Sequence, residues 1–418
     1  MGSERFIVII KMKIEMENKK VVHIALIGEQ TMPVYLAIKY SKAEKFIFIH
    51  SDQTKKRAEP LSKYVSKDGR SAELIKLDSV DFNAAKLQME EAIKKYDGWV
   101  IEANISSGTK PWTIALAVLS ESYSNVELIY VDQNSRIFNY KTSEVRDVEP
   151  LTINEILEYN QSIPEKDGRN ANRLRYKHLD DYTEEDYGLI PEIKGIRQKY
   201  NRGKQSLFND LTIPDKNRRN KVKFANNVKD TYVDPETSSE ISWNKHYVTE
   251  NGEIKQYVRL FFIGYAGHHE EFELISPHAF DLVTSSGWFE YELAKILEAW
   301  PSCKDVWMNV VFPYRDEKAK NEIDVIVGNG RKLLFVECKT QVQDNTDIDK
   351  FASAVKNYGG MGAKAIFITQ SKMGSKPEEK CETNKIAHFS FDAGQPKQKS
   401  RKDLYDVLDD LMKESNTR

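Results

Sequence analysis

The stretch of this chain that most constrains its fold is residues 322–340, which read EIDVIVGNGRKLLFVECKT. Two apolar runs rich in β-branched residues flank Asn329 and Gly330. Asn-Gly between two such runs is the strongest short-range signal for a β-hairpin, because a type I′ turn needs positive φ at both central residues. The sequence therefore predicts two antiparallel strands joined by a two-residue loop at Asn329-Gly330.

The predicted hairpin gathers charged side chains on one face. With a two-residue loop, Asp324 lies opposite Phe335, and Glu337 is the diagonal neighbour of Asp324. Side chains alternate between the two faces of a strand, so Phe335, Glu337 and Lys339 share one face with Asp324. The opposite face carries the apolar side chains of a core. The hairpin is thus predicted to bring two carboxylates and one ammonium together.

Two converging carboxylates form a hard-oxygen site suited to Mg²⁺ or Mn²⁺. Such a metal polarises a phosphoryl oxygen and lowers the pKa of a bound water, and Lys339 is suited to orient that water or to balance charge. The alternative is purely structural: Glu337 and Lys339 form an exposed strand pair, and Asp324 ends a strand. The site interpretation is favoured because an apolar strand, a turn and a shared face accompany the three residues.

The residues Asp324 and Glu337-Cys338-Lys339, with their spacing, resemble the D…ExK motif of restriction-endonuclease-like nucleases. The surrounding pattern agrees with that family, because a helix, three strands, a helix and a strand are predicted in this order. The proline that usually precedes the motif aspartate is absent, since Ile323 stands there. The resemblance implies an α/β nuclease domain at residues 272–418.

The resemblance also implies that an acid from the first helix of the nuclease core joins the metal site. Residues 287–300 predict this helix, with an apolar face and Pro301 after its end. Glu290 is the candidate and Glu292 is the alternative; both acids could instead be exposed helix residues. The implied metal ligands are Asp324, Glu337 and Glu290, and the implied catalytic residues are these three with Lys339.

Composition bounds the class of protein. The chain has 418 residues, too many for one compact core, so two domains are expected. Its 62 Lys and Arg nearly balance 64 Asp and Glu, so only the local charge distribution can indicate a nucleic-acid partner. No apolar run is long enough to cross a membrane. The 3 cysteines are widely spaced, without disulfide or zinc patterns, which indicates the reducing cytoplasm.

Residues 21–148 alternate short apolar strands with helical stretches. This alternation predicts an α/β domain with a parallel sheet covered by helices on both faces. Such sheets bind ligands at the carboxyl ends of their strands, near a topological switch point. Strands are predicted at residues 21–28, 46–50, 74–77, 99–104 and 126–132, with residues 137–140 forming a hairpin with the last of them.

Two strand ends in this domain carry polar turns. The first strand ends in GEQTMP at residues 28–33, and the fourth in NISSGTKP at residues 104–111. The second turn leads into a helix with Pro111 in its first turn, where the missing N–H is no loss. Its free amides, the helix dipole and Lys110 favour an anion such as phosphate. An ordinary strand-to-helix connection with Thr109 as N-cap explains the same residues equally well.

A doubly wound domain with these two turns resembles a CRISPR-associated Rossmann fold (CARF) domain, a family that senses the cyclic oligoadenylate made during type III CRISPR immunity. Followed by a D…ExK nuclease, it is similar to CARF-plus-restriction-like effectors activated by cyclic tetra-adenylate. The resemblance implies a homodimer, with the ring across the two-fold axis between two CARF domains. It also implies that the ring is bound by Gln30, Thr31, Ser106, Ser107, Gly108, Thr109 and Lys110.

The middle of the chain, residues 149–271, is interpreted as a basic connector with accessory strands. Residues 193–229 carry eleven Lys and Arg against two Asp. Such a stretch can follow a phosphate backbone, although a solvated connector fits the charge equally well. Helical periods are expected near Leu174, and residues 230–240 are interpreted as a turn-rich break between structured parts.

The sequence thus predicts a cytoplasmic, ligand-gated nuclease that depends on Mg²⁺ or Mn²⁺. It does not choose among single-stranded RNA, single-stranded DNA and nicked duplex DNA as substrate. One alternative is a CARF sensor that binds nucleic acid without cutting it, and another is a ring nuclease that degrades its own cyclic activator. A dinucleotide-dependent oxidoreductase or a P-loop ATPase is disfavoured, because no G-x-G-x-x-G follows the first strand and no Walker A motif is present.

Overall fold

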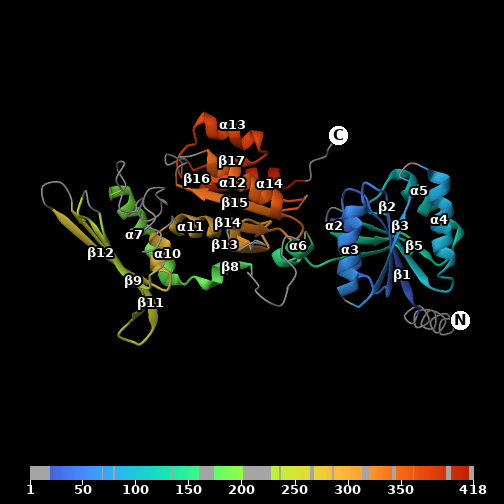
Figure 1. Ribbon diagram of the computed structural model, residues 1–418, viewed down its shortest axis with the longest axis horizontal. Coiled ribbons are helices and arrows are strands. Elements are labelled where there is room, and N and C mark those ends of the chain that lie inside the picture. Colours follow the sequence, from blue (N-terminus) through green and yellow to red (C-terminus); the bar gives the residue numbers. More distant parts are fainter. Residues whose placement is uncertain are drawn as a thin grey trace, which may run out of the picture. The chain divides into compact units, whose positions relative to one another are not determined.

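The computed structural model of the chain divides by internal contacts into two compact units, residues 1–151 and residues 152–418 (Figure 1). Among the residues described, no helix is long and apolar enough to span a membrane. The structure describes residues 19–67, 69–78, 81–132, 135–159, 174–200, 227–234, 237–263, 268–284, 287–312, 321–340, 345–360, 362–391 and 397–413.

The first unit is built on a seven-stranded sheet with strand order β3-β2-β1-β4-β5-β6-β7. The first five strands are parallel: β1 (Val21–Leu26), β2 (Lys45–His50), β3 (Ser71–Lys76), β4 (Val100–Asn104) and β5 (Val126–Val131). The last two are antiparallel: β6 (Arg136–Asn139) and β7 (Glu144–Asp147). The connecting helices are α2 (Met32–Tyr40), α3 (Lys55–Lys67), α4 (Phe82–Lys94) and α5 (Lys110–Ser122).

The predicted doubly wound arrangement of this unit is confirmed. Helices α4 and α5 pack on one face of the sheet, against buried side chains such as Ile24 and Leu26. Figure 1 shows α2 and α3 on the other face. The chain order reverses between β1 and β4, which lie side by side, so the turns that follow these two strands meet at the switch point.

The second unit is built on a six-stranded sheet with order β17-β16-β15-β14-β13-β8. Its core has the predicted succession of one helix, three strands, one helix and one strand. These elements are α11 (Gly287–Glu298), β13 (Asp305–Phe312), β14 (Asn321–Gly328), β15 (Leu333–Lys339), α12 (Thr346–Tyr358) and β16 (Lys364–Thr369). The sheet is completed by β8 (Arg175–His178) and β17 (Ala387–Ser390), with α6 (Ile153–Tyr159), α13 (Ser375–Thr383) and α14 (Lys397–Met412) around it.

A separate four-stranded antiparallel sheet belongs to the same unit. Two strands of this unit contradict the sequence analysis. The part of residues 230–240 taken as a break contains most of strand β9 of this sheet, and the chain after Leu174 forms strand β8 of the six-stranded sheet rather than a helix. Both strands are short and carry few apolar residues, so they lack a periodic signal. The sheet consists of β9 (Lys229–Val233), β10 (Glu240–Val248), β11 (Ile254–Ile263) and β12 (His269–Ser276).

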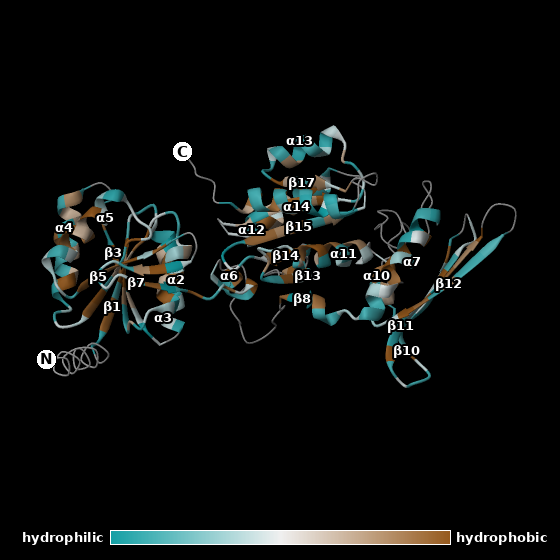
Figure 2. Cartoon of the chain, turned by 180° about the vertical axis from the view of Figure 1, so that it is seen from behind, coloured by the Kyte–Doolittle hydropathy of each residue, from teal (hydrophilic) through white to brown (hydrophobic). Residues whose placement is uncertain are grey.

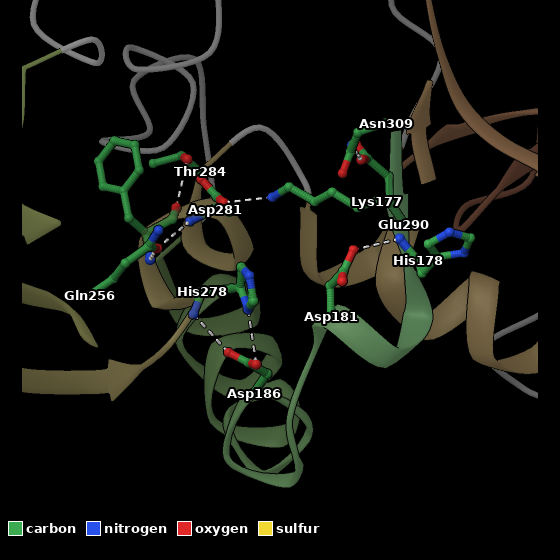
Figure 3. Close-up of polar contacts among 11 residues, drawn as sticks. Lys177, His178, Asp181, Asp186, Gln256, His278, Asp281, Thr284, Glu290 and Asn309 are labelled. Atoms are coloured by element: carbon green, nitrogen blue, oxygen red, sulfur yellow. Dashed lines mark hydrogen bonds and ion pairs between the residues drawn. The ribbon is translucent and has the colours of Figure 1, made fainter. Parts of the chain in front are cut away.

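Polar contacts tie this sheet to the nuclease-like core through helices α7 (Glu184–Tyr200) and α10 (Ala279–Val283) and the short 3₁₀ helix η1 (Leu179–Asp181). Figure 3 shows them: Asp186 of α7 accepts from the ring of His278 at 3.1 Å. Lys177 of β8 forms an ion pair with Asp281 of α10 at 2.8 Å. Burial penalises charge on Asp186, yet hydrogen bonds led by that of His278 lower its pKa to about 2, so this link persists across the usual pH range.

Apolar residues concentrate where the strands pack. Figure 2 shows hydrophobic colour on the central strands of both large sheets, whereas α3 and α13 are largely hydrophilic. Strand β14 is buried on both faces, with the apolar residues of β15 beside it. The sequence of a strand that is covered on both faces is a continuous apolar run. A charged side chain within such a strand therefore needs a specific partner.

The predicted register of the β14–β15 hairpin is wrong. The structure pairs Gly328 with Leu333, so the loop comprises residues 329–332 rather than Asn329-Gly330 alone. The Asn329 side chain accepts hydrogen bonds from the backbone N–H groups of Arg331 at 3.0 Å and Lys332 at 2.8 Å. Gly330 has φ of 86°, while Asn329 stays at negative φ, so the turn is not type I′.

The corrected register changes neighbours but not faces. Val325 pairs with Val336, and one further step along both strands places Asp324 directly opposite Glu337 rather than diagonal to it. The error amounts to two residues, and side chains alternate with period two, so the predicted shared face of Asp324, Glu337 and Lys339 survives the correction.

Candidate functional site

The site in the second unit lies where strands β14 and β15 part. Their pairing runs from Gly328–Leu333 to Val325–Val336, and β15 continues beyond it to Lys339. Asp324 comes at the point of separation, and its Oδ2 accepts a hydrogen bond from the backbone N–H of Cys338 at 2.7 Å. The Asp324 carboxylate therefore bridges the opening between the strands through this oxygen.

Lys339 holds the two carboxylates together. Its Nζ lies 2.7 Å from Oε1 of Glu337 and 3.6 Å from Oδ2 of Asp324. Each carboxylate side chain is 13% exposed, so the contacts form in a largely dry environment where charges interact strongly. The three residues predicted from the D…ExK spacing are thus brought within direct contact.

Burial and neighbouring charges shift the pKa values of the acids in this site. Burial and the charge of Asp324 raise the pKa of Glu337 to about 8, against the opposing effect of Lys339. Burial alone would lower the pKa of Lys339, but Asp324 and Glu337 raise it well above its ordinary value. A second cation near Asp324 and Glu337 would therefore be bound favourably.

Glu290 reaches the same region from helix α11. It is 8% exposed, and its Oε2 accepts a hydrogen bond from Nδ2 of Asn309 at 2.9 Å (Figure 3). Burial and the nearby charge of Asp324 raise the pKa of Glu290 well above its ordinary value. The alternative acid, Glu292, instead forms an ion pair with Lys194 at 2.5 Å.

Asn309 is a site residue that the sequence analysis missed. It lies in strand β13 with φ of 48°, between the pairs Met308–Val325 and Val310–Ile323, and therefore faces Asp324 across the sheet. Positive φ in a non-glycine residue costs energy and concentrates at functional sites. The sequence gives only one weak indication of this role, which is an Asn inside an otherwise apolar strand.

The donor set fits a hard divalent cation only in part. Asp324 and Glu337 offer converging carboxylate oxygens in a buried site, which suits Mg²⁺ or Mn²⁺ with water completing the shell. Among the described residues, however, no group of three or more His, Cys, Asp or Glu side chains is placed to hold a metal ion together. Glu290 is accordingly near the two carboxylates without forming a three-acid cluster with them.

In the first unit, the two turns predicted as ligand-binding come into contact. A Cβ built on Gly28 would lie 2.5 Å from the backbone nitrogen of Gly108, and the N–H of Gly28 donates to Oγ of Ser107 at 3.0 Å. Gly108 has φ of 91°, and a Cβ there would lie 2.6 Å from Cβ of Leu26. Glycine is therefore required at both positions for the turns to approach each other.

The predicted ligand residues of these turns differ in availability. The hydroxyl of Ser106 is occupied, because it donates to Oδ1 of Asn104 at 2.6 Å and accepts from the N–H of Val131 at 2.8 Å. Thr109 is the N-cap of α5, yet its buried Oγ1 finds no hydrogen-bond partner in the described part of the chain. Lys110 and Gln30 are exposed, whereas Thr31 is buried.

A buried polar chain supports the second turn from below, and the sequence analysis missed it. His23 is fully buried, with Nδ1 at 2.9 Å from Glu102 and Nε2 at 3.4 Å from Nδ2 of Asn104. Burial raises the pKa of Glu102, but the contact with His23 lowers it, and the net effect is a pKa below its ordinary value. The chain runs across β1 and β4 to Ser106, so it fixes the turn between β4 and α5.

The basic stretch of residues 193–229 is described only in part, because residues 201–226 lie outside the described ranges. Within α7, the described cations have partners in the same unit: Lys194 pairs with Glu292, and Lys199 pairs with Glu270. The guanidinium of Arg197 donates to the carbonyl oxygen of Val283 at 2.6 Å.

Comparison with known families matches both units. Residues 22–157 match the family model of the Card1 CARF domain, and residues 280–377 match that of the Card1-like endonuclease domain. The chain therefore contains a CARF domain followed by an endonuclease domain, as the sequence resemblance implied. No curated protein sequence matches the chain.

Solved structures support the same architecture. Can2 from Sulfobacillus thermosulfidooxidans, in complex with cyclic tetra-adenylate, aligns over 94% of this chain and 99% of its own, with TM-score 0.55 and 14% identity. Protein VC1899 from Vibrio cholerae aligns over 94% of this chain and 98% of its own, with TM-score 0.54 and 16% identity. At such identities the likeness concerns the fold alone.

Proposed function

We propose that this chain is a nuclease of type III CRISPR defence whose CARF domain binds cyclic tetra-adenylate and whose endonuclease domain then hydrolyses phosphodiester bonds. The observation that carries the proposal is the contact of Asp324, Glu337 and Lys339 at the parting of two strands. It lies inside the matched endonuclease domain, and the same chain carries a matched CARF domain.

Each residue of the site has a chemical role in this proposal. Asp324 and Glu337 would hold Mg²⁺ or Mn²⁺, which supplies charge stabilisation and an activated water when bound. Asp324 stays oriented through the N–H of Cys338. Lys339, next to both carboxylates, would donate to the attacking water or to a phosphoryl oxygen where negative charge develops.

Glu290 would assist the same cation from the helix side. Its carboxylate is oriented by the amide of Asn309, which itself faces Asp324 from strand β13. A ligand held by a neighbouring amide in this manner keeps one orientation, and such supporting contacts commonly tune metal affinity. Asn309 is therefore a positioning residue in the proposed mechanism.

The CARF domain would bind the activator at the meeting turns after β1 and β4. Three features of the second turn support an anionic ring phosphate there: the Thr109 hydroxyl, which has no partner among the described residues, the exposed Lys110, and the first amides of α5. Gln30 and Thr31 would contact the ring from the first turn, and Ser106, Ser107 and Gly108 would shape the second.

A homodimer completes this proposal. Cyclic tetra-adenylate is symmetric, and a two-fold interface presents the same turn twice, so two CARF domains can share one ring. Binding activates only if the ring has higher affinity for the dimer arrangement in which the nuclease domains can cut. A cytoplasmic location follows from the proposed role in defence.

The test is cleavage of labelled single-stranded RNA, single-stranded DNA and supercoiled plasmid with Mn²⁺ and cyclic tetra-adenylate. We expect Glu337→Gln and Lys339→Gln to lower the rate at least 10²-fold, in the range measured when one stabilising group is lost from an active site. Glu298→Gln, on the exposed side of α11, is the matched control and should cut as wild type does.

Two results would redirect the proposal. Binding of the activator without cutting of any substrate would favour the alternative of a sensor that binds nucleic acid. Conversion of cyclic tetra-adenylate to a linear product that is insensitive to Glu337→Gln would favour a ring nuclease in the CARF domain.

A further inference from the structure

Exposed cations gather in two short segments of the second unit that the proposed chemistry does not use. The first segment, residues 370–377, reads QSKMGSKP and runs from the end of β16 into the first turn of α13. The second, residues 397–402, reads KQKSRK and forms the first turns of α14. Neither segment contains an acid, although the whole chain has 62 Lys and Arg against 64 Asp and Glu. We call these cations the basic edge, and they are Lys372, Lys376, Lys397, Lys399, Arg401 and Lys402, all exposed.

The segment after β16 lies beside the proposed catalytic residue Lys339. Strands β15, β16 and β17 are parallel neighbours, so their carboxyl ends lie along one edge of the sheet, about 5 Å apart from strand to strand. The backbone N–H of Gln370 donates to the carbonyl oxygen of Lys339 at 3.0 Å, and that of Met373 donates to Oγ of Ser390 at 3.3 Å. Lys372 therefore belongs to a loop that runs from the end of β15 to the end of β17.

Helix α14 is held parallel to α11. The hydroxyl of Tyr405 donates to the carbonyl oxygen of Ile296 at 2.7 Å, and Nε1 of Trp300 donates to Oδ1 of Asp409 at 2.9 Å. The two members of each pair lie 109 residues apart along the chain. The two helices therefore run in the same direction and in step with each other.

This arrangement brings the basic turns of α14 to the end of α11 that carries Glu290. Arg401 and Lys397 precede Tyr405 by one and two turns on the same face of α14, because residues four apart share a helix face. The same offset of 109 residues places them level with residues 288–292 of α11, which include Glu290.

A ring contact supports this placement. Phe391 directly follows β17, and its ring centroid lies 6.4 Å from that of Phe289, the residue before Glu290. The chain thus leaves the sheet beside the first turn of α11, shortly before Lys397 begins α14. The loop of Lys372 and the first turns of α14 therefore border the proposed catalytic site at the same end of the sheet.

The cations of the basic edge have no carboxylate partner in the part of the chain that the structure describes. In contrast, Lys177, Lys194 and Lys199 pair with carboxylates of the same unit. The charges of α14 also run against the helix dipole, because its first turns carry cations and no acid, whereas Asp409 and Asp410 lie near its other end. Such an arrangement is expected where the cations serve a partner outside the chain.

We propose that the basic edge binds the phosphate backbone of the substrate strand to one side of the bond that is cleaved. The proposal rests on the proposed nuclease function, because it concerns the substrate of the same site. A strand whose scissile phosphate lies at Lys339 would cross the loop of Lys372 and reach Lys397 and Arg401 on α14. Exposed Lys and Arg side chains attract backbone phosphates whatever the base sequence, so the basic edge would supply affinity and position the strand without reading its sequence.

The test measures strand binding apart from cleavage. Fluorescein-labelled single-stranded DNA and RNA of ten nucleotides are titrated with the full chain in EDTA at several salt concentrations, with and without cyclic tetra-adenylate, and anisotropy is followed. Each phosphate contact to a single strand contributes about 0.7 to the slope of log K against log salt, which is about fivefold in affinity at ~0.1 M salt. The double variant Lys397→Gln/Arg401→Gln should therefore bind about 25-fold more weakly, with a slope reduced by about 1.4. Its melting temperature should not fall, because the removed charges oppose the helix dipole.

The double variant Lys356→Gln/Lys385→Gln is the matched control. Both lysines are exposed, and neither forms an ion pair among the described residues. Lys356 lies in the last turn of α12, which leads into β16, and Lys385 lies just before β17. They therefore lie toward the amino ends of these strands, away from Lys339, and this variant should bind the strand as wild type does.

Equal affinities and salt slopes for wild type and Lys397→Gln/Arg401→Gln would overturn the proposal. An equal loss in the control variant would overturn it too, since the effect would then follow from net charge, and so would the lack of any strand binding by wild type. Cleavage is measured separately with Mn²⁺. Cutting by wild type with unchanged binding in Lys397→Gln/Arg401→Gln would overturn this inference alone, whereas the predicted loss of binding in a protein that cuts nothing would overturn the nuclease function alone.

Discussion

The replacement Glu337→Gln should make the metal-free endonuclease domain more stable at neutral pH. Glu337 lies largely buried beside Asp324, and its pKa is raised from 4.5 to about 8 in the folded chain. The unfolded chain releases the proton near the ordinary value, so between these two pKa values the folded state binds more protons than the unfolded state. The stability of the wild type therefore falls as pH rises from about 4.5 to about 8.

The magnitude follows from the same two values. The interval from 4.5 to about 8 corresponds to at most roughly 5 kcal/mol of stability lost above both pKa values. At pH 6 about 2 kcal/mol of this is lost, and at pH 8 about 4 kcal/mol. Glutamine mimics the protonated acid and has no charge to bury, so Glu337→Gln should match wild type near pH 4.5 and exceed it increasingly above that pH.

The assay is urea unfolding in EDTA at pH 5, 6, 7 and 8, followed by tryptophan fluorescence. The signal reports mainly on the second unit, because Trp243, Trp288, Trp300 and Trp307 lie there, against two tryptophans in the first unit. A difference between variant and wild type that stays constant across this pH range would refute the reasoning. Glu298→Gln serves as the control for loss of an exposed acid.

Three further predictions concern single positions. Gly108→Ala should destabilise the CARF domain by about 2–4 kcal/mol and abolish activator binding in calorimetry, since φ of 91° and a Cβ contact of 2.6 Å with Leu26 both oppose a side chain. Asn309→Gly keeps the positive φ but deletes the amide on Glu290, so calorimetry should show Mn²⁺ affinity reduced about 10-fold with melting temperature nearly unchanged. Lys110→Gln should weaken cyclic tetra-adenylate about tenfold, with a smaller salt dependence of binding.

Much of the fold was predictable because its signals are local. In residues 21–148, the buried strands β1, β2, β4 and β5 are short apolar runs bounded by polar turns, and helical stretches separate them, so the alternation of strands and helices is visible in the local sequence. The exposed strand β7, with sequence EVRD, gives no such signal. The shared face of Asp324, Glu337 and Lys339 was predictable for a related reason. Alternation along a strand has period two, and it tolerated an error of two residues in the register.

The features that escaped prediction depend on contacts between distant residues. The register failed because the Asn329 side chain binds the backbone of its own loop, an arrangement that the Asn-Gly pair does not reveal. Asn309 gains its role from a positive φ in the middle of a strand and from Glu290 on another element. The chain from Glu102 through His23 to Asn104 exists only after β1 and β4 are paired.

The strands β8 and β9 escaped for a different reason. They are short and mostly polar, and their side chains are exposed or only half buried. Their place is set by pairing with β13 and β10, respectively, rather than by their own propensity. Sequence patterns therefore located the hairpin of the proposed catalytic site and the turns of the proposed ligand site, while tertiary pairing decided what surrounds them.

The most direct test of the account is the rate of single-strand cleavage with Mn²⁺, measured with and without cyclic tetra-adenylate for wild type, Lys110→Gln and Glu337→Gln. The account predicts cutting by wild type only with the activator, a need for more activator in Lys110→Gln, and no cutting by Glu337→Gln at any activator concentration. Equal rates with and without cyclic tetra-adenylate would contradict the proposal that the activator controls cleavage. Undiminished cutting by Glu337→Gln would contradict the proposed catalytic site.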